Sequence, residues 1–144
     1  MDIKLLWKDV LEQNREELKK YFCSDAEIHW PCTNERFSAD EFIRVNCDYP
    51  GEWSGEVERV ENTDVGCITV TRVFARDSSA ALYVVSFFTC RDEKIAFVEE
   101  YWSNEDENRE TDPKVSGKEK DKRRTGKDFI AQAYCSCILH VNTT

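Results

Sequence analysis

The first twenty residues place apolar side chains at a helical period. Apolar residues recur at spacings of three and four over residues 3–22, which predicts one amphipathic helix. Asp2 can cap its N-terminus, and Lys19 and Lys20 complement the helix dipole at its C-terminus. Asn14 lies within the apolar stripe, where a polar side chain needs a hydrogen-bond partner. The stripe consists of Ile3, Leu6, Trp7, Val10, Leu11, Leu18, Tyr21 and Phe22.

Two shorter elements follow this helix. Residues 26–31 predict a short strand, which Pro31 ends or places at the edge of a sheet. Ser38 and Glu41 have the spacing of a capping box, which predicts a helix of about ten residues that stops before Pro50. The inward face of this second helix would carry Phe42, Ile43 and Asn46.

From residue 53 the period changes from helical to strand-like. Segments rich in β-branched and aromatic residues are separated by turn-forming residues, and the short connections predict an antiparallel meander. The third segment is apolar on both faces, so we expect the helices to cover one face. A second subunit or the C-terminal part of the chain would cover the other. The four predicted strands are residues 53–62, 67–76, 80–90 and 94–102.

The last third of the chain differs in composition. Residues 103–128 are highly charged with few apolar side chains, which predicts a charged linker or mobile tail. Residues 129–144 become apolar again, with polar residues spaced by four, and predict a short docking helix, although their Ile and Val content also allows a strand. We therefore expect one folded domain over residues 1–102, followed by these two segments.

Charge and cysteine content narrow the class of protein. The 144 residues carry 29 acidic and 20 basic side chains, a formal net charge of −9, and seven cysteines. An acidic surface argues against a nucleic-acid partner, and no window reaches the roughly 18 apolar residues of a membrane span. The first residues do not resemble a signal peptide, and isolated cysteines among apolar neighbours are typical of reduced thiols, so we expect a cytoplasmic protein.

Several common site motifs are missing from the sequence. No cysteine or histidine pairs have the spacing of a zinc site, so we expect no metal. No Gly-rich phosphate loop or Ser-His-Asp arrangement is recognisable, so we expect no nucleotide and no other cofactor.

Helices followed by a long, twisted meander predict an α+β fold with a conical hollow, whose opening would bind a small molecule. Short motifs also follow one another over residues 1–102. They are Trp7 with Asn14 and Leu18-x-x-Tyr21-Phe22, Asp25-Ala-x-Ile28-x-Trp30, Thr33-Asn-Glu35-x-Phe37, Glu41-Phe-Ile43, Asn46-Cys-x-Tyr-Pro-Gly-x-Trp53, Val85-Ser-Phe87, and Lys94-Ile through Glu100-Tyr-Trp102.

This order resembles the NTF2-like superfamily and, within it, the SnoaL-like domains. The resemblance implies a cone-shaped α+β barrel with N-terminal helices packed on a curved antiparallel sheet, often a homodimer built through the sheet faces. Such folds include isomerases, polyketide cyclases, hydrolases and dehydratases, together with members that catalyse nothing. The fold therefore does not determine the function, which depends on the site residues.

Two carboxylates are the leading candidates for proton transfer. Glu35 lies between a short strand and a helix, near the expected pocket opening, where desolvation would raise its pKa. Alternatively, it is a solvent-facing acid or pairs with Arg36 or Arg44. Glu99 and Glu100 lie on opposite faces of the last strand, and we favour Glu100 as the pocket acid because Trp102 would be its neighbour. The other acid would then make an intersubunit hydrogen bond.

His29 is a third catalytic candidate. It alternates with Glu27 on the predicted strand, and the two could form an acid–base dyad; an exposed histidine or one with satisfied hydrogen bonds is the alternative.

Aromatic and amide side chains are the candidates for ligand binding. They could surround a flat or cyclic ligand and donate hydrogen bonds to its oxygen atoms, although core packing explains many such aromatic residues equally well. The candidates are Tyr21, Trp30, Asn46, Trp53 and Trp102.

Two functions remain open from the sequence. One is a cofactor-free enzyme that transfers a proton on a small, apolar, carbonyl-containing ligand, with a carboxylate as the proton carrier. The other is a non-catalytic, dimeric domain that binds a ligand or a protein. An open pocket with an isolated carboxylate favours the first, whereas a hollow filled by Trp and Phe side chains favours the second.

Overall fold

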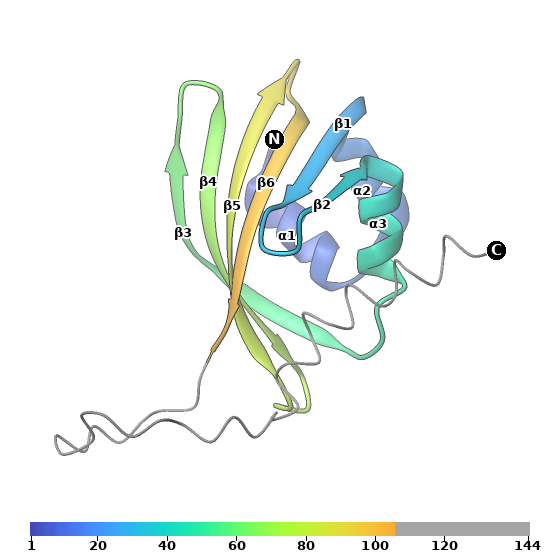
Figure 1. Ribbon diagram of the computed structural model, residues 1–144, viewed down its shortest axis with the longest axis vertical. Helices are drawn as coiled ribbons and strands as arrows, with labels where there is room; N and C mark the ends of the chain where they lie inside the picture. The colour runs from blue at the N-terminus through green and yellow to red at the C-terminus, as the bar shows by residue number, and fades with distance from the viewer. Residues whose placement is uncertain (106–144) are drawn as a thin grey trace, which may run out of the picture.

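The computed structural model describes residues 1–105, which form short helices packed on one face of a curved six-stranded sheet (Figure 1). The predicted tail, residues 103–128, and the predicted docking helix, residues 129–144, lie outside the described residues except for the end of the last strand. The elements are α1 (Ile3–Leu11), α2 (Arg15–Leu18), the 3₁₀ turn η1 (Lys19–Tyr21), β1 (Phe22–Trp30), β2 (Glu35–Ser38), α3 (Ala39–Cys47), β3 (Trp53–Asn62), β4 (Gly66–Ala75), β5 (Ala81–Arg91) and β6 (Lys94–Asn104).

The sheet has the strand order β2-β1-β6-β5-β4-β3, so β2 and β3 are its edges and it does not close. The predicted antiparallel meander is confirmed as β3 to β6, with boundaries within two residues of the expected ones. The sheet as a whole is mixed because β1 pairs in parallel with β6. This pairing joins residues about seventy positions apart in the chain, for which the local pattern of side chains contains no signal.

The first helix is shorter than predicted. A single helix over residues 3–22 is wrong because α1 ends at Leu11 and Gln13 adopts a left-handed conformation with φ 56°. The amide of Asn14 donates to the carbonyl of Asp9 and that of Gln13 to Val10, which is the hydrogen-bond pattern of a Schellman motif. Glycine normally occupies the position of Gln13, so the sequence carries no visible stop signal there.

The predicted start of the second helix is confirmed. The Ser38 hydroxyl accepts a hydrogen bond from the amide of Glu41, and the Glu41 carboxylate accepts one from the amide of Ser38. This capping box satisfies two amides at the start of α3. It also directs Phe42 and Ile43 into the core, where both are buried.

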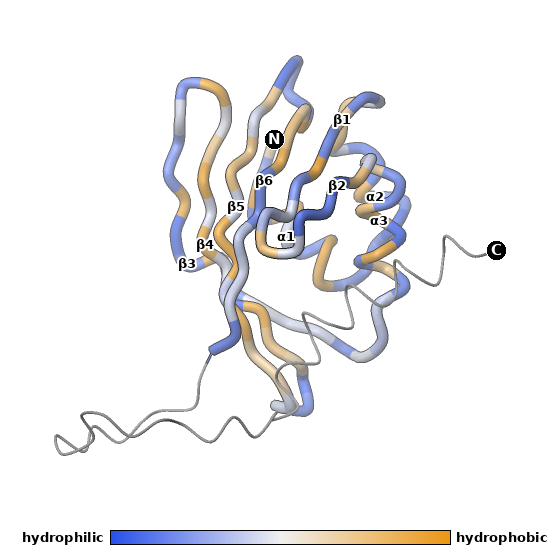
Figure 2. Tube along the Cα trace, viewed as in Figure 1, coloured by the Kyte–Doolittle hydropathy of each residue, from blue (hydrophilic) through white to orange (hydrophobic). Residues whose placement is uncertain are grey.

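The core lies between the helices and the concave face of the sheet. Buried residues alternate with less buried ones along β4 and most of β5, and the hydropathy colouring shows apolar stretches along these strands (Figure 2). On the opposite face, no element within residues 1–105 covers the sheet, and Phe87 and Tyr101 are 42% and 39% exposed. None of the helices described is long and apolar enough to cross a membrane.

Candidate functional site

A cavity of about 70 Å³ lies between the helices and the concave face of the sheet. Its walls are almost entirely apolar and aromatic, and its one ionisable carboxyl among the described residues is Glu100. Such a concave, apolar site with few polar groups is typical of small-molecule binding. The lining residues are Leu6, Trp7, Val10, Leu11, Gln13, Phe22, Trp30, Phe42, Asn46, Tyr49, Trp53, Val73, Leu82, Val84, Phe88, Val98, Glu100 and Trp102.

Glu100 reaches this cavity because of its register in the sheet. It pairs with Ser86 of β5 and lies on the concave face of β6, as alternation with Val98 requires. The residue is only 6% exposed. Its Oε2 accepts a hydrogen bond from Trp30 Nε1 at 2.9 Å, and its Oε1 accepts one from the Ser86 hydroxyl at 3.0 Å.

Burial raises the pKa of Glu100 above its ordinary value, and the hydrogen bonds from Trp30 and Ser86 oppose that rise only in part. No Lys, Arg or His in residues 1–105 forms an ion pair with this carboxylate. An indole can only donate, whereas a hydroxyl can donate or accept. A proton on Glu100 is therefore best accommodated at Oε1, where Ser86 can reverse its role.

Sequence reasoning missed the buried hydroxyls next to Glu100. Thr69 of β4 pairs with Ser86 of β5, which pairs with Glu100 of β6, so the three form one polar row across the concave face. Thr69 and Ser86 are fully buried, and Thr69 Oγ1 accepts a hydrogen bond from Trp7 Nε1 at 3.2 Å. The sequence signal that could have found them is strand alternation, since both hydroxyls occupy inward positions on strands whose other inward residues are mostly apolar.

Glu99 and His29 lie together on the convex face of the sheet. They are register partners, and His29 Nδ1 lies 3.4 Å from Glu99 Oε2. Glu99 Oε1 also accepts a hydrogen bond from the Tyr101 hydroxyl at 2.8 Å. Glu27, the expected dyad partner of His29, forms an ion pair with Arg36 instead. His29 therefore does not line the cavity, because strand alternation turns it to the other face.

Glu35 lies at the first position of β2, directly opposite Trp30 in the sheet. It is not among the residues that line the cavity. Its Oε1 atom is buried and has no hydrogen-bond partner among residues 1–105. The structure thus pairs Glu35 in the sheet with Trp30, the residue whose indole binds Glu100, but does not place Glu35 in the cavity lining.

Tyr21 does not point its hydroxyl into the cavity as expected. The hydroxyl donates to Asp9 Oδ2 at 2.7 Å, and Asp9 Oδ1 accepts from Asn14 Nδ2 at 3.2 Å. Burial, helped by the hydrogen bond and charge of Asp9, raises the pKa of Tyr21 to about 12. Asp9 is thus the partner that Asn14 requires, and the three side chains tie α1 to the turns that follow it.

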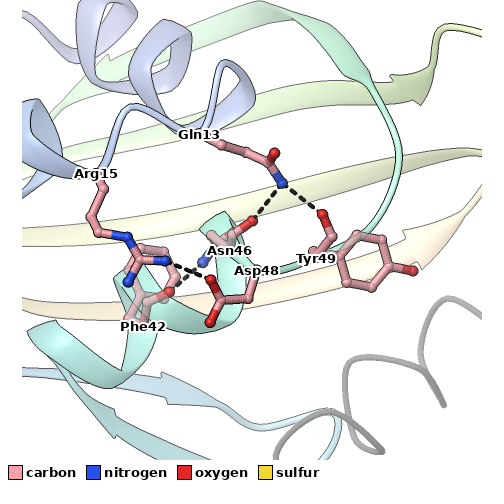
Figure 3. Close-up of polar contacts among 6 residues, drawn as sticks. All are labelled: Gln13, Arg15, Phe42, Asn46, Asp48 and Tyr49. Atoms are coloured by element: carbon pink, nitrogen blue, oxygen red, sulfur yellow. Dashed lines mark hydrogen bonds and ion pairs between the residues drawn. The ribbon is translucent and has the colours of Figure 1, made fainter.

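Asn46 lines the cavity, but its amide nitrogen is already bonded within α3. Asn46 Nδ2 donates to the carbonyl of Phe42 at 2.8 Å. Gln13 Nε2 donates to the carbonyls of Asn46 and Tyr49 at 2.9 and 2.8 Å (Figure 3). Gln13, which the sequence did not single out, thereby joins the turn after α1 to the end of α3 at the cavity wall.

The three candidate tryptophans all line the cavity. Trp30 and Trp102 meet edge to face with ring centroids 6.4 Å apart. The indole of Trp53 donates to the carbonyl of Pro50 at 3.1 Å. Among residues 1–105, no group of three or more His, Cys, Asp or Glu side chains could hold a metal ion, and the five cysteines there are free.

No protein-family model matches the sequence, and no curated protein matches it either. Solved structures do match. A candidate ketosteroid isomerase from Kribbella flavida is 19% identical with a TM-score of 0.63, over 83% of this chain and 90% of that chain. An NTF2-like protein of unknown function from Burkholderia xenovorans is 18% identical with a TM-score of 0.64, over 80% and 90% of the two chains.

A third match is a candidate SnoaL-like polyketide cyclase from Shewanella putrefaciens, 9% identical with a TM-score of 0.57 over 71% of this chain and 80% of that chain. The matched structures share an α+β architecture, so the chain has the NTF2-like fold, and the predicted fold class is confirmed. At these identities the likeness shows the fold, and the function has to be argued from the cavity.

Proposed function

We propose that the protein binds a small, apolar, carbonyl-containing compound in the cavity and that Glu100 exchanges a proton with it without a cofactor. The observation that carries this proposal is the buried carboxyl of Glu100, which lines an apolar cavity and has no cation beside it among the described residues. A carboxyl whose pKa is raised by burial can both accept and return a proton near neutral pH.

The chemistry begins with the ionised form of Glu100. The carboxylate takes a proton from the carbon next to the ligand carbonyl, and the electron pair moves to the carbonyl oxygen to form an enolate. Return of a proton from Oε1 to carbon restores the carboxylate and completes the cycle. Ser86 follows the change by donating to the carboxylate and accepting from the acid, while Trp30 holds Oε2 in place.

The ligand class is supported by two neighbours with this fold. They are described as a candidate ketosteroid isomerase and a candidate SnoaL-like polyketide cyclase, and both names refer to keto-containing compounds. Trp30, Trp53, Trp102 and Asn46 are proposed as walls that contact the ligand. Glu35, His29 and Tyr21 lie outside the cavity lining, so they are not part of the proposed proton transfer.

One observation favours a second candidate function, in which the cavity binds a ligand without catalysis. The indole of Trp53 and the amides of Gln13 and Asn46 already donate to backbone carbonyls. These donors would have to change partners before they could stabilise an enolate oxygen.

Homodimer formation through the convex face is part of the proposal. Phe87 and Tyr101 are exposed there and their rings pack edge to face, 6.1 Å apart. A partner that buries such side chains removes apolar area from water. A cytoplasmic location remains a prediction from the charge and cysteine content of the sequence.

The decisive experiment is α-proton exchange of cyclopentanone in D₂O, followed by proton NMR with and without the full chain. We expect protein-dependent deuterium uptake that is lost in Glu100→Gln. Glu99→Gln, the matched change on the opposite face of the same strand, should retain the wild-type rate. Binding of cyclopentanone without exchange, detected by saturation transfer, would support the second candidate function instead.

A further inference from the structure

A second hollow lies beside the cavity, between α1 and the edge strand β3. It encloses about 300 Å³ and, unlike the cavity, is lined by charged side chains. We refer to it as the α1–β3 groove. Its lining residues are Lys4, Trp7, Lys8, Leu11, Glu12, Trp53, Ser54, Gly55, Glu56, Val57 and Arg76.

The groove and the cavity share one wall. Trp7, Leu11 and Trp53 line both hollows, so these side chains border the groove on one side and the cavity on the other. The floor of the groove is closely packed at Gly55, where a Cβ atom would come within 3.1 Å of Leu11 Cδ1 and 2.5 Å of the carbonyl oxygen of Arg72. Glycine at this position therefore lets α1 approach β3 and forms the base of the groove.

The charge of the groove is opposite to that of the whole chain. Three cationic side chains face two carboxylates in the groove, although the chain has a formal net charge of −9. Lys8 is paired with Glu12 at 2.9 Å. The side chains of Lys4 and Arg76 make no ion pair or hydrogen bond with any described residue, so both are available to an anion.

We propose that the groove binds the carboxylate of an amphipathic ligand whose apolar body passes the shared wall into the cavity. This inference rests on the proposed function, because it identifies the class of compound that reaches Glu100. A carboxylate does not readily enter the cavity itself, since it would lose its water and meet almost entirely apolar walls and a second carboxyl group. At Lys4 and Arg76 it keeps its hydration and gains two cationic neighbours.

This division of polar and apolar surface orients the ligand. The carboxylate of the ligand stays in the α1–β3 groove beside Lys4 and Arg76, and the opposite end of the molecule extends towards Glu100 in the cavity. The ligand class is therefore a small carboxylic acid with a carbonyl group remote from its acid end. The cavity volume limits how many carbon atoms can be buried.

The test is calorimetric titration of the full chain with acetate, butanoate, hexanoate and the neutral analogue 1-hexanol. If the apolar chain of the acid enters the cavity, the affinity rises from acetate to hexanoate by about fourfold for each methylene group buried. In the double variant Lys4→Gln, Arg76→Gln, the Kd for hexanoate should rise roughly two- to thirtyfold, as expected for the loss of two exposed ionic contacts. The Kd for 1-hexanol should not change.

A matched double variant removes the same charge elsewhere. Arg44 and Lys94 are exposed, line neither hollow and form no ion pair with a described residue. Arg44→Gln with Lys94→Gln should leave the Kd for hexanoate at the wild-type value. An equal rise in the Kd for hexanoate in both double variants would overturn the inference. Equal affinity of the wild type for acetate and hexanoate would also overturn it.

The two proposals fail in different ways. If hexanoate binding does not depend on Lys4 and Arg76 while Glu100-dependent exchange of cyclopentanone persists, only the groove inference is wrong. If hexanoate binds as predicted but no exchange occurs in the wild type, the groove inference stands and proton transfer is wrong.

Discussion

Replacement of Glu100 by glutamine should stabilise the protein at neutral pH. Glutamine has nearly the same shape, and its Oε1 can accept from Trp30 Nε1 while its Nε2 donates to the Ser86 hydroxyl, so both hydrogen bonds are retained. The change therefore removes mainly the cost of a buried negative charge in a residue that is 6% exposed.

The size of this stabilisation follows from how the free energy of unfolding of the wild type depends on pH. The pKa of Glu100 in the folded protein is raised above its ordinary value of 4.5 by burial. Between that value and the folded pKa, the unfolded chain binds fewer protons than the folded one, so the wild type loses stability as the pH rises. The slope is at most about 1.4 kcal/mol per pH unit. The glutamine side chain cannot ionise, so the Glu100→Gln variant does not share this loss.

Urea unfolding followed by tryptophan fluorescence, from pH 4 to pH 8, measures this difference. At pH 4 we expect the free energies of unfolding to agree within about 1 kcal/mol, and above it the variant should become progressively more stable than the wild type. Glu52→Gln, an exposed change of the same charge, should show no growing difference. A difference that is independent of pH, or one that favours the wild type as the pH rises, would refute the argument.

Three further predictions concern the scaffold. Gly55→Ala should cost about 1–3 kcal/mol in thermal or urea unfolding, because its Cβ would meet the Arg72 carbonyl at 2.5 Å. Glu93→Gly should stabilise the protein by about 0.5–1 kcal/mol, because Glu93 has φ 63° in the two-residue turn between β5 and β6. In alkaline absorbance titration, the phenol of Tyr21 should ionise near pH 12, and Asp9→Asn should lower that midpoint by removing a negative charge.

Each scaffold prediction has its own control. Ser54→Ala changes the neighbouring position of β3, adds no Cβ atom next to the Arg72 carbonyl oxygen, and should leave the free energy of unfolding nearly unchanged. Glu61→Gly, at an ordinary strand position, should destabilise rather than stabilise, since glycine weakens a strand. Tyr21→Phe should remove the late-titrating phenol, and its persistence would show that another tyrosine accounts for the signal.

Strand alternation was the most informative feature of the sequence. It located β3 to β6, and it separated Glu99 from Glu100, because the period of a strand places neighbouring residues on opposite faces. The capping box at Ser38 likewise marked the start of α3. These features depend only on residues close together in the chain, which is why a single sequence contains them.

Features that depend on distant contacts were not predictable in the same way. The parallel pairing of β1 with β6 turned His29 towards Glu99 and Trp30 towards Glu100, and no local pattern specifies that register. Gln13 ends α1 in a conformation that usually requires glycine. The Tyr21 hydroxyl, which we expected to point into the hollow, donates a hydrogen bond to Asp9 instead. Asp9 is buried, and nothing in the local sequence distinguishes it from an exposed acid.

The central claim is that Glu100 holds a titratable proton within reach of a ligand in the cavity. The most direct test is carbon NMR of the full chain labelled at the glutamate Cδ, with the Glu100 signal assigned by its loss in Glu100→Gln. The account predicts a titration midpoint above the ordinary value of 4.5 and a change in that signal when cyclopentanone is added. A midpoint at or below this value, together with no response to cyclopentanone, would contradict it.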